Sequence, residues 1–551
     1  MKNIKKISLI IFLALCPAIL FAQQAHKVSP SKVSRPKLVV GIVVDQMRWD
    51  YLYRYYERFG EGGFKRLLQD GFKCENTYIN YLPSATAVGH SAIFSGTTPA
   101  INGIASNDWV DQLSGAHLYC TDDSTVNSVG TTSNEGKMSP RNLLSTTITD
   151  ELRIASNFRS KVVGVSLKDR ASILPAGHTP TGAFWFDDTS GRFITSTYYM
   201  EKLPEWVNNF NSLNEPEKLT ANEWDSLYPL NTYVQSTNDN SSWEGKFSGE
   251  TAPTFPHKIS ELYKLHHVTI RSTPFGNTLT LDFAKAAVAA YKLGQTSETD
   301  FLTINCASTD YVGHMYGPNA VETEDTYLRL DRDLAAFFKD LDEKVGKGNY
   351  TVFLTADHGA SNSVDYNKAH HIPAGFWKQE DYRDRLNKML KDKFKVDKLV
   401  ISVVEYQVNF NIPKIKASGL NYDAIKKASV DYLRDDPATL FVADMAKLND
   451  EAIPDVIKTK MVNGYNYRRS GAVWVIPTAG WLQTNPVGTS HGEWNPYDTH
   501  IPLIFMGWGI KAGKTYHNVY TTDIAPTIAA LLNIQAPSGC IGKPIESVLS
   551  K

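Results

Sequence analysis

The sequence has almost no excess of charge of either sign, few cysteines and only one long apolar run. Its 57 Lys and Arg residues are balanced by 58 Asp and Glu residues, which leaves a net charge of −1. This balance excludes a general electrostatic attraction to nucleic acid or to an anionic membrane. Five cysteines in 551 residues are too few for a disulfide-stapled scaffold. Hydrophobic residues at 42% and charged residues at 21% are typical of a folded globular protein.

The one long apolar run lies at the N-terminus and has the features of a secretory signal peptide. Residues 1–22 begin with Lys2, Lys5 and Lys6 and continue with an apolar stretch at 9–22. This stretch is shorter than the roughly 20 residues that cross a bilayer. We therefore predict a cleaved signal peptide at 1–22, no membrane span, and a periplasmic or secreted chain from 23 to 551. An uncleaved N-terminal anchor is the alternative.

Buried strands alternate with helices along most of the chain. Residues 37–44 form a continuous apolar run, which is typical of a central parallel strand. Further strands are predicted at 161–167, 301–306, 350–356 and 501–505, and helices at 50–69, 278–293, 324–344 and 522–532. The alternation predicts an α/β fold in which a central, mostly parallel sheet is sandwiched between helices.

Two regions interrupt this alternation. Residues 185–276 are rich in Trp, Asn, Ser and Pro, and residues 366–480 mix Lys-rich helical patterns with short strands. We predict that both are insertions in a single catalytic domain spanning 23–551, and that they cap its core.

Polar residues stand where the predicted strands end. Asp45 follows the first strand, Asp310 follows 301–306 after a short turn, and Asp357 and His358 end the strand 350–356. Ligands of open parallel sheets bind at the carboxyl edge of the strands, so these side chains are expected to converge. Taken singly, each is explained as well by a surface turn, a polar strand end or a helix cap.

Two more histidines complete the set. His314 lies four residues after Asp310 and can face the same metal from one helical turn, and His491 lies in a polar loop before the strand 501–505. Alone, each fits a solvated turn or loop. Together, three carboxylates and three imidazoles without cysteine suit zinc sites that stay open for catalysis. Six ligands divide into two metals, which can clamp an in-line phosphoryl displacement, so we predict two Zn²⁺ per chain.

A nucleophile is available just before the apolar, helix-like run 87–94. Ser84 and Thr86 place hydroxyl groups there, where the positive end of the helix dipole favours negative charge. A divalent metal bound to such a hydroxyl also makes it lose its proton more readily. Either residue could instead be the helix N-cap, and the spacing does not distinguish the two roles.

These motifs, in this order, resemble the alkaline phosphatase superfamily, and most closely the exported, phosphate-insensitive PafA-type alkaline phosphatases of Bacteroidetes. The likeness spans essentially the whole mature chain. It is carried by the segments around Asp45, Thr86, Asp310, His314, Asp357, His358 and His491, and by residues 37–50, 162–175 and 522–527.

The resemblance implies a role for each candidate residue. Thr86 is expected to be the nucleophile that becomes transiently phosphorylated. Asp310, His314 and His491 would bind one zinc, which activates the hydrolytic water and holds the leaving oxygen. Asp45, Asp357 and His358 would bind the other zinc, to which Thr86 is also bound. Asn107, Lys168 and Arg170 would hold the nonbridging phosphoryl oxygens.

The basic pair favours phosphate monoesters as substrates. Lys168 and Arg170 are two residues apart, so on an extended strand both would point to one face. Two zinc ions balance three carboxylates and a threonine alkoxide, and the basic pair then matches a dianionic monoester better than a diester. We expect a monomer that acts on small phosphate monoesters. A phosphodiesterase or nucleotide pyrophosphatase of the same superfamily is the main alternative, and an exported binding protein with a structural metal is another.

Overall fold

A computed structural model describes residues 34–483 and 486–550 of the chain. Its contacts separate residues 1–34 from a compact unit at 35–551, and only the latter is described below. The predicted signal peptide at 1–22 lies outside the described residues. Among the described helices, none is both long and apolar enough to cross a lipid bilayer.

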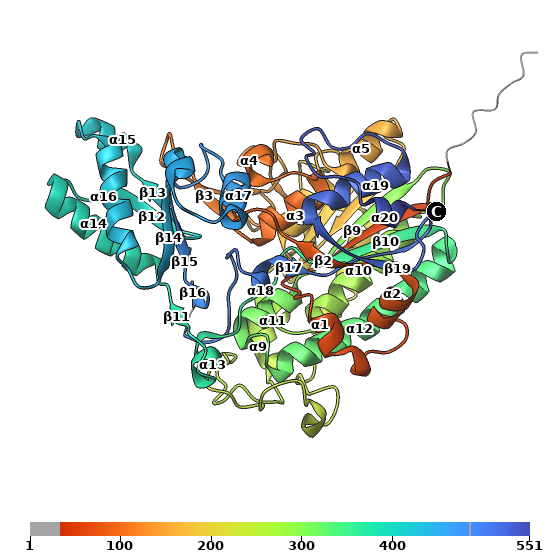
Figure 1. Cartoon of the computed structure of the whole chain (residues 1–551). Helices are drawn as coiled ribbons and strands as arrows, with labels where there is room; N and C mark the ends of the chain where they lie inside the picture. Colours follow the sequence, from red (N-terminus) through yellow and green to blue (C-terminus); the bar gives the residue numbers. More distant parts are fainter. Residues whose placement is uncertain (1–33, 484–485, 551) are drawn as a thin grey trace, which may run out of the picture. The chain divides into compact units, whose positions relative to one another are not determined.

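An 11-stranded mixed sheet forms the centre of the unit (Figure 1). The five central strands β10, β1, β9, β6 and β7 are parallel, and the strands next to them on either side are antiparallel to them. The sequence predicted four of the five; β7 was not predicted, and the strand predicted at 501–505 falls mainly on the antiparallel β18. In sheet order the strands are β17 (His500–Ile501), β2 (Phe72–Tyr78), β18 (Leu503–Gly507), β10 (Tyr350–Thr355), β1 (Leu38–Val44), β9 (Asp300–Cys306), β6 (Val162–Val165), β7 (Gly182–Asp187), β8 (Arg192–Ser196) and β5 (Ser128–Val129), with β19 (Gly513–Tyr520) paired to β2.

The register of the central strands brings their carboxyl ends into line. Val44 of β1 pairs with Cys306 of β9, and Val43 pairs with Thr355 of β10. Residues that follow these three strands therefore start from the same edge of the sheet.

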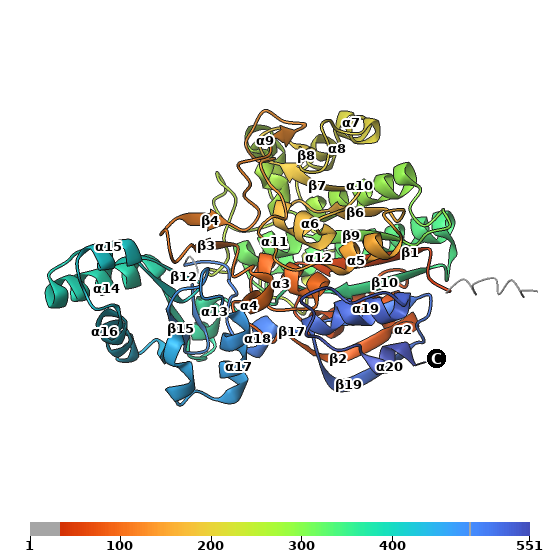
Figure 2. The same cartoon turned by 90° about the horizontal axis from the view of Figure 1, so that it is seen from above.

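Helices cover both faces of the sheet (Figures 1 and 2). Leu38, Val40 and Ile42 of β1 pack in one core with α10 (Phe275–Tyr291) and α12 (Val321–Leu341). Val39 and Val43 pack in a second core with α3 (Thr86–Ser95), α5 (Ile148–Ala155) and α19 (Ile524–Leu532). Because successive side chains of a strand point to opposite faces, one continuous apolar run supplies both cores.

The helix predicted at 50–69 is broken. The structure has α1 (Tyr51–Arg54), a 3₁₀ turn (Tyr56–Arg58) and α2 (Phe64–Asp70). The break lies where Asp331 of α12 accepts hydrogen bonds from the backbone N–H groups of Gly60 and Phe64, both at 2.7 Å. A Cβ at Gly63 would lie only 2.2 Å from the Asp331 carbonyl oxygen, so the close approach requires glycine.

The first part of the segment 185–276, which was predicted to be an insertion, belongs to the main sheet. β7 and β8 are antiparallel neighbours within the main sheet. Their residues Phe186, Phe193 and Ile194 are buried in the cores on the two faces. The Trp- and Asn-rich composition hides this hairpin, because aromatic residues also suit a buried strand.

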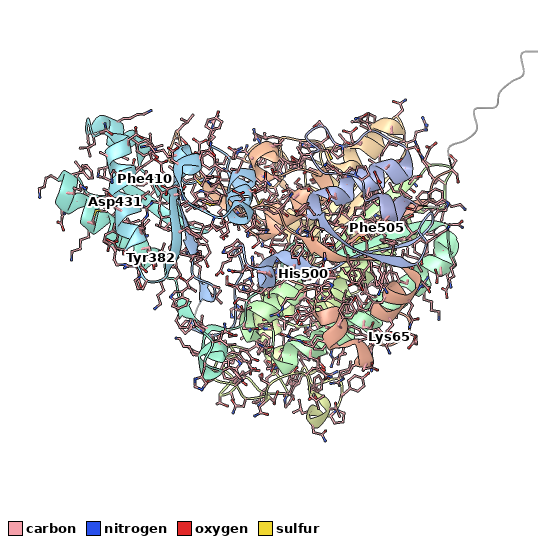
Figure 3. The ribbon with its side chains drawn as sticks, in the orientation of Figure 1. Lys65, Tyr382, Phe410, Asp431, His500 and Phe505 are labelled. Carbon is pink, nitrogen blue, oxygen red and sulfur yellow. The ribbon has the colours of Figure 1, made fainter. Side chains whose placement is uncertain are left out.

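Residues 366–480 contain a sheet of their own. It consists of β12 (Val400–Val404), β13 (Gln407–Phe410), β15 (Val473–Pro477) and β14 (Thr439–Asp444), in that order. The helices α14 (Gln379–Phe394) and α16 (Tyr422–Arg434) pack on it in a separate hydrophobic core. Tyr382 and Phe410 belong to this core (Figure 3). We call this part the inserted module.

The four cysteines of the described residues form no disulfide. Cys74, Cys120 and Cys306 are buried, and Cys540 is half-buried. Burial raises the pKa of the Cys306 thiol. The fold is therefore held by its packed cores rather than by covalent crosslinks.

Candidate functional site

Three carboxylates lie at the carboxyl edge of the central strands, and a lysine bridges two of them. Asp45 follows β1, Asp357 lies two residues after β10, and Asp310 lies in the first turn of α11 (Ser308–Tyr316), after β9. The buried Lys168 Nζ donates to Asp45 Oδ2 at 2.8 Å and to Asp310 Oδ2 at 2.7 Å. Burial alone would lower the pKa of Lys168, but Asp310 and Asp45 raise it, so a cation already links two of the carboxylates.

The three histidines are all oriented in the same way. Each ring uses Nδ1 to contact a backbone carbonyl oxygen, which can only accept a hydrogen bond. These contacts are His358 to Gly359 at 3.0 Å, His314 to Thr489 at 2.9 Å and His491 to Ser84 at 2.7 Å. Burial lowers the pKa of His358, and burial with the neighbouring rings lowers that of His491. The lowered pKa favours neutral rings at His358 and His491, which then present the Nε2 lone pair to the site. The pKa of His314 is raised instead, by the neighbouring Asp310 carboxylate.

One group of ligand atoms comes entirely from strand ends. Asp45, Asp357 and His358 are fully buried, and their ligand atoms lie within 4.8 Å of one another. His358 Nε2 is 3.6 Å from Asp45 Oδ1 and 3.4 Å from Asp357 Oδ2. Burial, and then the charge of Asp357, raise the pKa of Asp45 well above its usual range. We call these three residues the strand-end group.

The other group comes from α11 and the loop before α18 (Pro496–Thr499). His314 Nε2 lies 3.2 Å from Asp310 Oδ1, and His491 Nε2 lies 3.7 Å from the same oxygen. The atoms that lie within 4.8 Å of one another here belong to Asp310, His491 and His358. The sequence assigned His314 to this position and His358 only to the strand-end group. The rings of His358 and His491 stack at 3.5 Å, so the two groups are contiguous. We call Asp310, His314 and His491 the helix–loop group.

The residues present fit a bound metal. Asp45 Oδ1, Asp357 Oδ2 and His358 Nε2 are buried and have no hydrogen-bond partner. Two carboxylate oxygens and a nitrogen lone pair repel one another when they face each other with no proton between them. A divalent cation placed between them would remove this electrostatic repulsion. Oxygen and imidazole donors without sulfur are a set that zinc accepts.

Thr86 is the first residue of α3 and is buried. Its Oγ1 lies 3.5 Å from Lys168 Nζ. The N-cap is Ala85, which has no capping side chain, and Ser84 Oγ instead donates to the carbonyl of Glu493 at 3.0 Å. Neither hydroxyl therefore caps the helix, so the alternative that Ser84 or Thr86 is only an N-cap is excluded.

Asn107 supplies the missing cap. Its Oδ1 accepts a hydrogen bond from the backbone N–H of Ala87 at 2.9 Å. The side chain is half-buried. Since the carbonyl end of the amide is used by the helix, the NH₂ end remains as a donor beside Thr86.

The sequence predicted that Lys168 and Arg170 lie on an extension of a strand, and the structure shows that they do not. Lys168 is the N-cap of α6 (Asp169–Ala176), and Arg170 lies in the first turn of that helix. Arg170 Nη1 donates to the Tyr119 hydroxyl at 3.0 Å, and its buried Nε has no partner. The pair therefore reaches the site from a helix N-terminus.

Sequence reasoning missed three residues near the site. Gln46 donates through Nε2 to Asp310 Oδ1 at 2.7 Å and through its backbone N–H to Asp357 Oδ1 at 3.2 Å, so it links the two groups. The ring of Tyr311 lies 5.0 Å from Lys168 Nζ. Glu405 reaches the same region from the inserted module. Gln46 and Tyr311 each follow a predicted metal ligand directly in the sequence, Asp45 and Asp310, and this position could have indicated them. Nothing in the sequence indicated Glu405.

Comparison with known proteins agrees with this geometry. The profile described as type I phosphodiesterase / nucleotide pyrophosphatase matches residues 39–500. The chain is 55% identical to alkaline phosphatase PafA of Elizabethkingia meningoseptica over 94% of this chain and 95% of that protein. It is 51% identical to alkaline phosphatase PhoV of Synechococcus elongatus over 96% of each. A crystal structure of wild-type PafA matches with a TM-score of 0.93 at 55% identity, covering 94% of this chain and 100% of that one. The chain therefore belongs to the type I phosphodiesterase / nucleotide pyrophosphatase family, within the alkaline phosphatase superfamily.

Proposed function

We propose that the chain is a phosphate monoesterase that releases inorganic phosphate through a phosphothreonine intermediate at a two-zinc site. The observation that carries the proposal is that two adjoining groups of ligand atoms are bridged by Lys168, whose Nζ also lies 3.5 Å from the Thr86 hydroxyl. The names of the relatives at 55% and 51% identity support the same activity.

Thr86 is the proposed nucleophile. Its position at the N-terminus of α3 stabilises negative charge on Oγ1, and Lys168 Nζ lies 3.5 Å away. Zinc held by the two groups would supply the Lewis acidity that lowers the pKa of this hydroxyl and of the hydrolytic water. Attack of Oγ1 on phosphorus forms a threonine–phosphate bond and breaks the bond to the leaving alcohol, and water then releases phosphate and restores Thr86.

Three donors are proposed to hold the phosphoryl oxygens. These are the NH₂ group of Asn107, the ammonium of Lys168 and the guanidinium of Arg170, whose Nε has no partner in the protein. Such donors are worth most where charge develops in the transition state, because they need no reorganisation. Two cations suit a dianionic monoester, which favours a monoesterase over the diesterase that shares the family.

The remaining assignments are part of the same proposal. We infer a signal peptide at 1–22, export to the periplasm or the medium, one catalytic domain over 23–551 with the two inserted segments, and a monomer. The leader is supported by Lys2, Lys5 and Lys6 before an apolar stretch.

Metal analysis of the purified protein combined with an ester panel tests the proposal. We expect two equivalents of zinc and much faster phosphate release from a monoester than from a diester with the same leaving group. A protein with zinc but a preference for the diester would be a phosphodiesterase. One with a single metal and no turnover of either ester would be a binding protein.

A further inference from the structure

The inserted module reaches the site through one tight turn. Glu405 and Tyr406 join β12 to β13, and both have left-handed backbone angles, with φ of 50° and 59°. Tyr406 is buried, and its hydroxyl donates to Glu493 Oε1 at 3.2 Å. It also accepts a hydrogen bond from the backbone N–H of Gln483 at 3.0 Å. The turn is therefore anchored next to the segment that carries His491.

Glu405 extends from this turn between two segments of the site. Ser106, which precedes Asn107, donates through Oγ to Glu405 Oε1 at 3.4 Å. On the other side lies Gly492, where a Cβ atom would be only 2.9 Å from Glu405 Oε2. Gly492 has a φ of 119°, so glycine both permits the backbone and leaves room for the carboxylate.

Among the residues that the structure describes, no cation forms an ion pair with Glu405, although the charge of His314 acts to lower its pKa. His117 is 3.5 Å from Asp108, and Arg469 donates to backbone carbonyls and lies 5.0 Å from the Trp109 ring. Burial raises the pKa of Glu405 to about 7, so the carboxyl group is ionised at alkaline pH.

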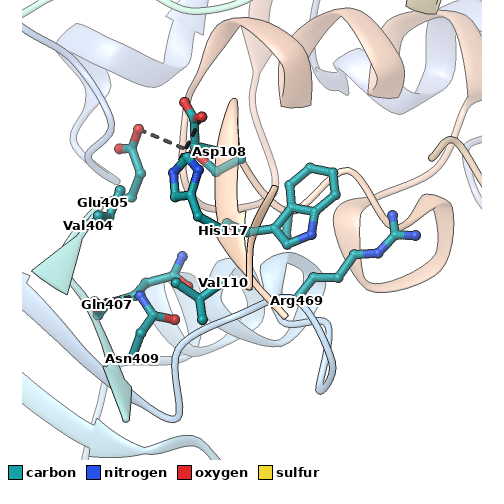
Figure 4. A pocket seen from close by; sticks show the side chains of 11 residues that line it. Asp108, Val110, His117, Val404, Glu405, Gln407, Asn409 and Arg469 are labelled. Carbon is teal, nitrogen blue, oxygen red and sulfur yellow. Dashed lines mark hydrogen bonds and ion pairs between the residues drawn. The ribbon is translucent and has the colours of Figure 1, made fainter. Parts of the chain in front are cut away.

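The space behind Glu405 is too small for a substrate. The cavity between β3 (Asp108–Val110) with β4 (His117–Tyr119) on one wall and the β12–β13 turn on the other measures about 20 Å³ (Figure 4). That volume holds one water at most. Glu405 therefore does not line a pocket that could hold a substrate on this side.

We propose that Glu405 determines specificity by the charge of the alcohol part of the ester. Its carboxylate lies against Gly492, the residue after His491, and close enough to His314 for their charges to interact. His314 and His491 are assigned to the zinc that holds the leaving oxygen, so that side of the substrate meets a fixed negative charge. Esters whose alcohol carries an ammonium group are favoured, and esters whose alcohol carries a second anionic group are disfavoured. The inference rests on the proposed monoesterase function.

The test compares wild type and Glu405→Gln on two esters at alkaline pH, namely O-phosphoethanolamine and 3-phosphoglycerate. The readout is the ratio of kcat/KM for the two esters within each protein, which does not depend on the fraction of active enzyme. The change in this ratio from wild type to the variant also does not depend on the intrinsic reactivity of either ester. We expect the variant to shift this ratio toward 3-phosphoglycerate by about tenfold, as expected for two charges several ångströms apart near a protein surface.

Two controls sharpen the test. Glu380→Gln removes the same charge from an exposed position on α14 of the inserted module and should leave the ratio unchanged. Ser106→Ala frees the Glu405 carboxylate from its hydrogen bond and should shift the ratio in the same direction as Glu405→Gln, but less. An unchanged ratio in Glu405→Gln overturns the inference and leaves the monoesterase proposal intact. Absence of phosphate release from both esters by wild type would count against the monoesterase itself.

Discussion

The strand-end group and the helix–loop group differ in what holds their ligands in place. Asp45, Asp357 and His358 have no exposed side-chain surface, whereas the side chain of His314 is 37% exposed and that of His491 is 10% exposed. The first group follows directly from β1 and β10, which are both paired on two sides: β1 with parallel strands, and β10 with the parallel β1 and the antiparallel β18. The same ladder that builds the core therefore fixes these ligands.

The helix–loop group depends on tertiary hydrogen bonds instead. His314 is oriented by the carbonyl of Thr489 and His491 by the carbonyl of Ser84, residues far away in the sequence. Local opening of a loop costs less free energy than disruption of central strands. We therefore expect the two groups to differ in how readily they would release a bound metal.

The largest effect is expected on removal of metal. A chelator should abolish phosphatase activity, because both groups would lose the cation that supplies the Lewis acid. Release measured with a metal indicator should be biphasic, with the helix–loop group emptied first. In His314→Asn the fast phase should be diminished or already absent. A single phase that releases both equivalents together would remove the distinction between the groups.

Thr86→Ala should cause the next largest loss of activity and should leave the metal content of both groups unchanged. Loss of the nucleophile should lower turnover by about a thousandfold or more, while the six ligands remain. Phosphate release and metal content measured on the same sample check this. Thr86→Ser keeps a hydroxyl and serves as the control, with an intermediate rate. Wild-type turnover in Thr86→Ala would show that the nucleophile is a different group.

The basic pair tests whether the site is matched to a dianion. The double variant Lys168→Ala with Arg170→Ala should lower kcat/KM for a monoester by about a hundredfold, since both groups are expected to stabilise charge in the transition state. Its effect on a diester should be only a few-fold. Lys168 also bridges the two groups through Asp45 and Asp310, so Arg170→Ala alone is the cleaner control. Equal losses on both esters would contradict the charge argument.

Much of the strand-end group was readable from the sequence. An apolar run followed by Asp45 predicts a buried parallel strand with a carboxylate at its end, and the structure has this arrangement. Periodicity suffices here because the strand and its terminal residue are adjacent in the chain. Four of the five central parallel strands were predicted for the same reason, and β7 was not.

The rest depends on contacts between distant segments. The helix predicted at 50–69 breaks at Gly60, Gly62 and Gly63, a local signal that the prediction passed over. The partner at the break, Asp331, accepts two backbone hydrogen bonds there and has no local signal. Lys168 and Arg170 lie at a helix N-terminus instead of on a strand, because the strand β6 ends at Val165. Glu405 comes from the inserted module, so only the folded chain brings it to the site.

The smallest expected effect comes from removing the hydrogen bonds that hold the metal ligands of each group in place. Ser84 Oγ accepts the backbone N–H of Gly492 at 3.2 Å and steadies the loop that carries His491, whereas Asn305 donates to Asp45 Oδ2 at 3.2 Å. Loss of such supporting hydrogen bonds typically weakens metal binding by about tenfold. Ser84→Ala should therefore accelerate only the fast phase of metal release, and Asn305→Ala only the slow phase. If both substitutions changed the same phase, the two groups would act as one coupled site, and the difference in exposure of their side chains would have no consequence for metal binding.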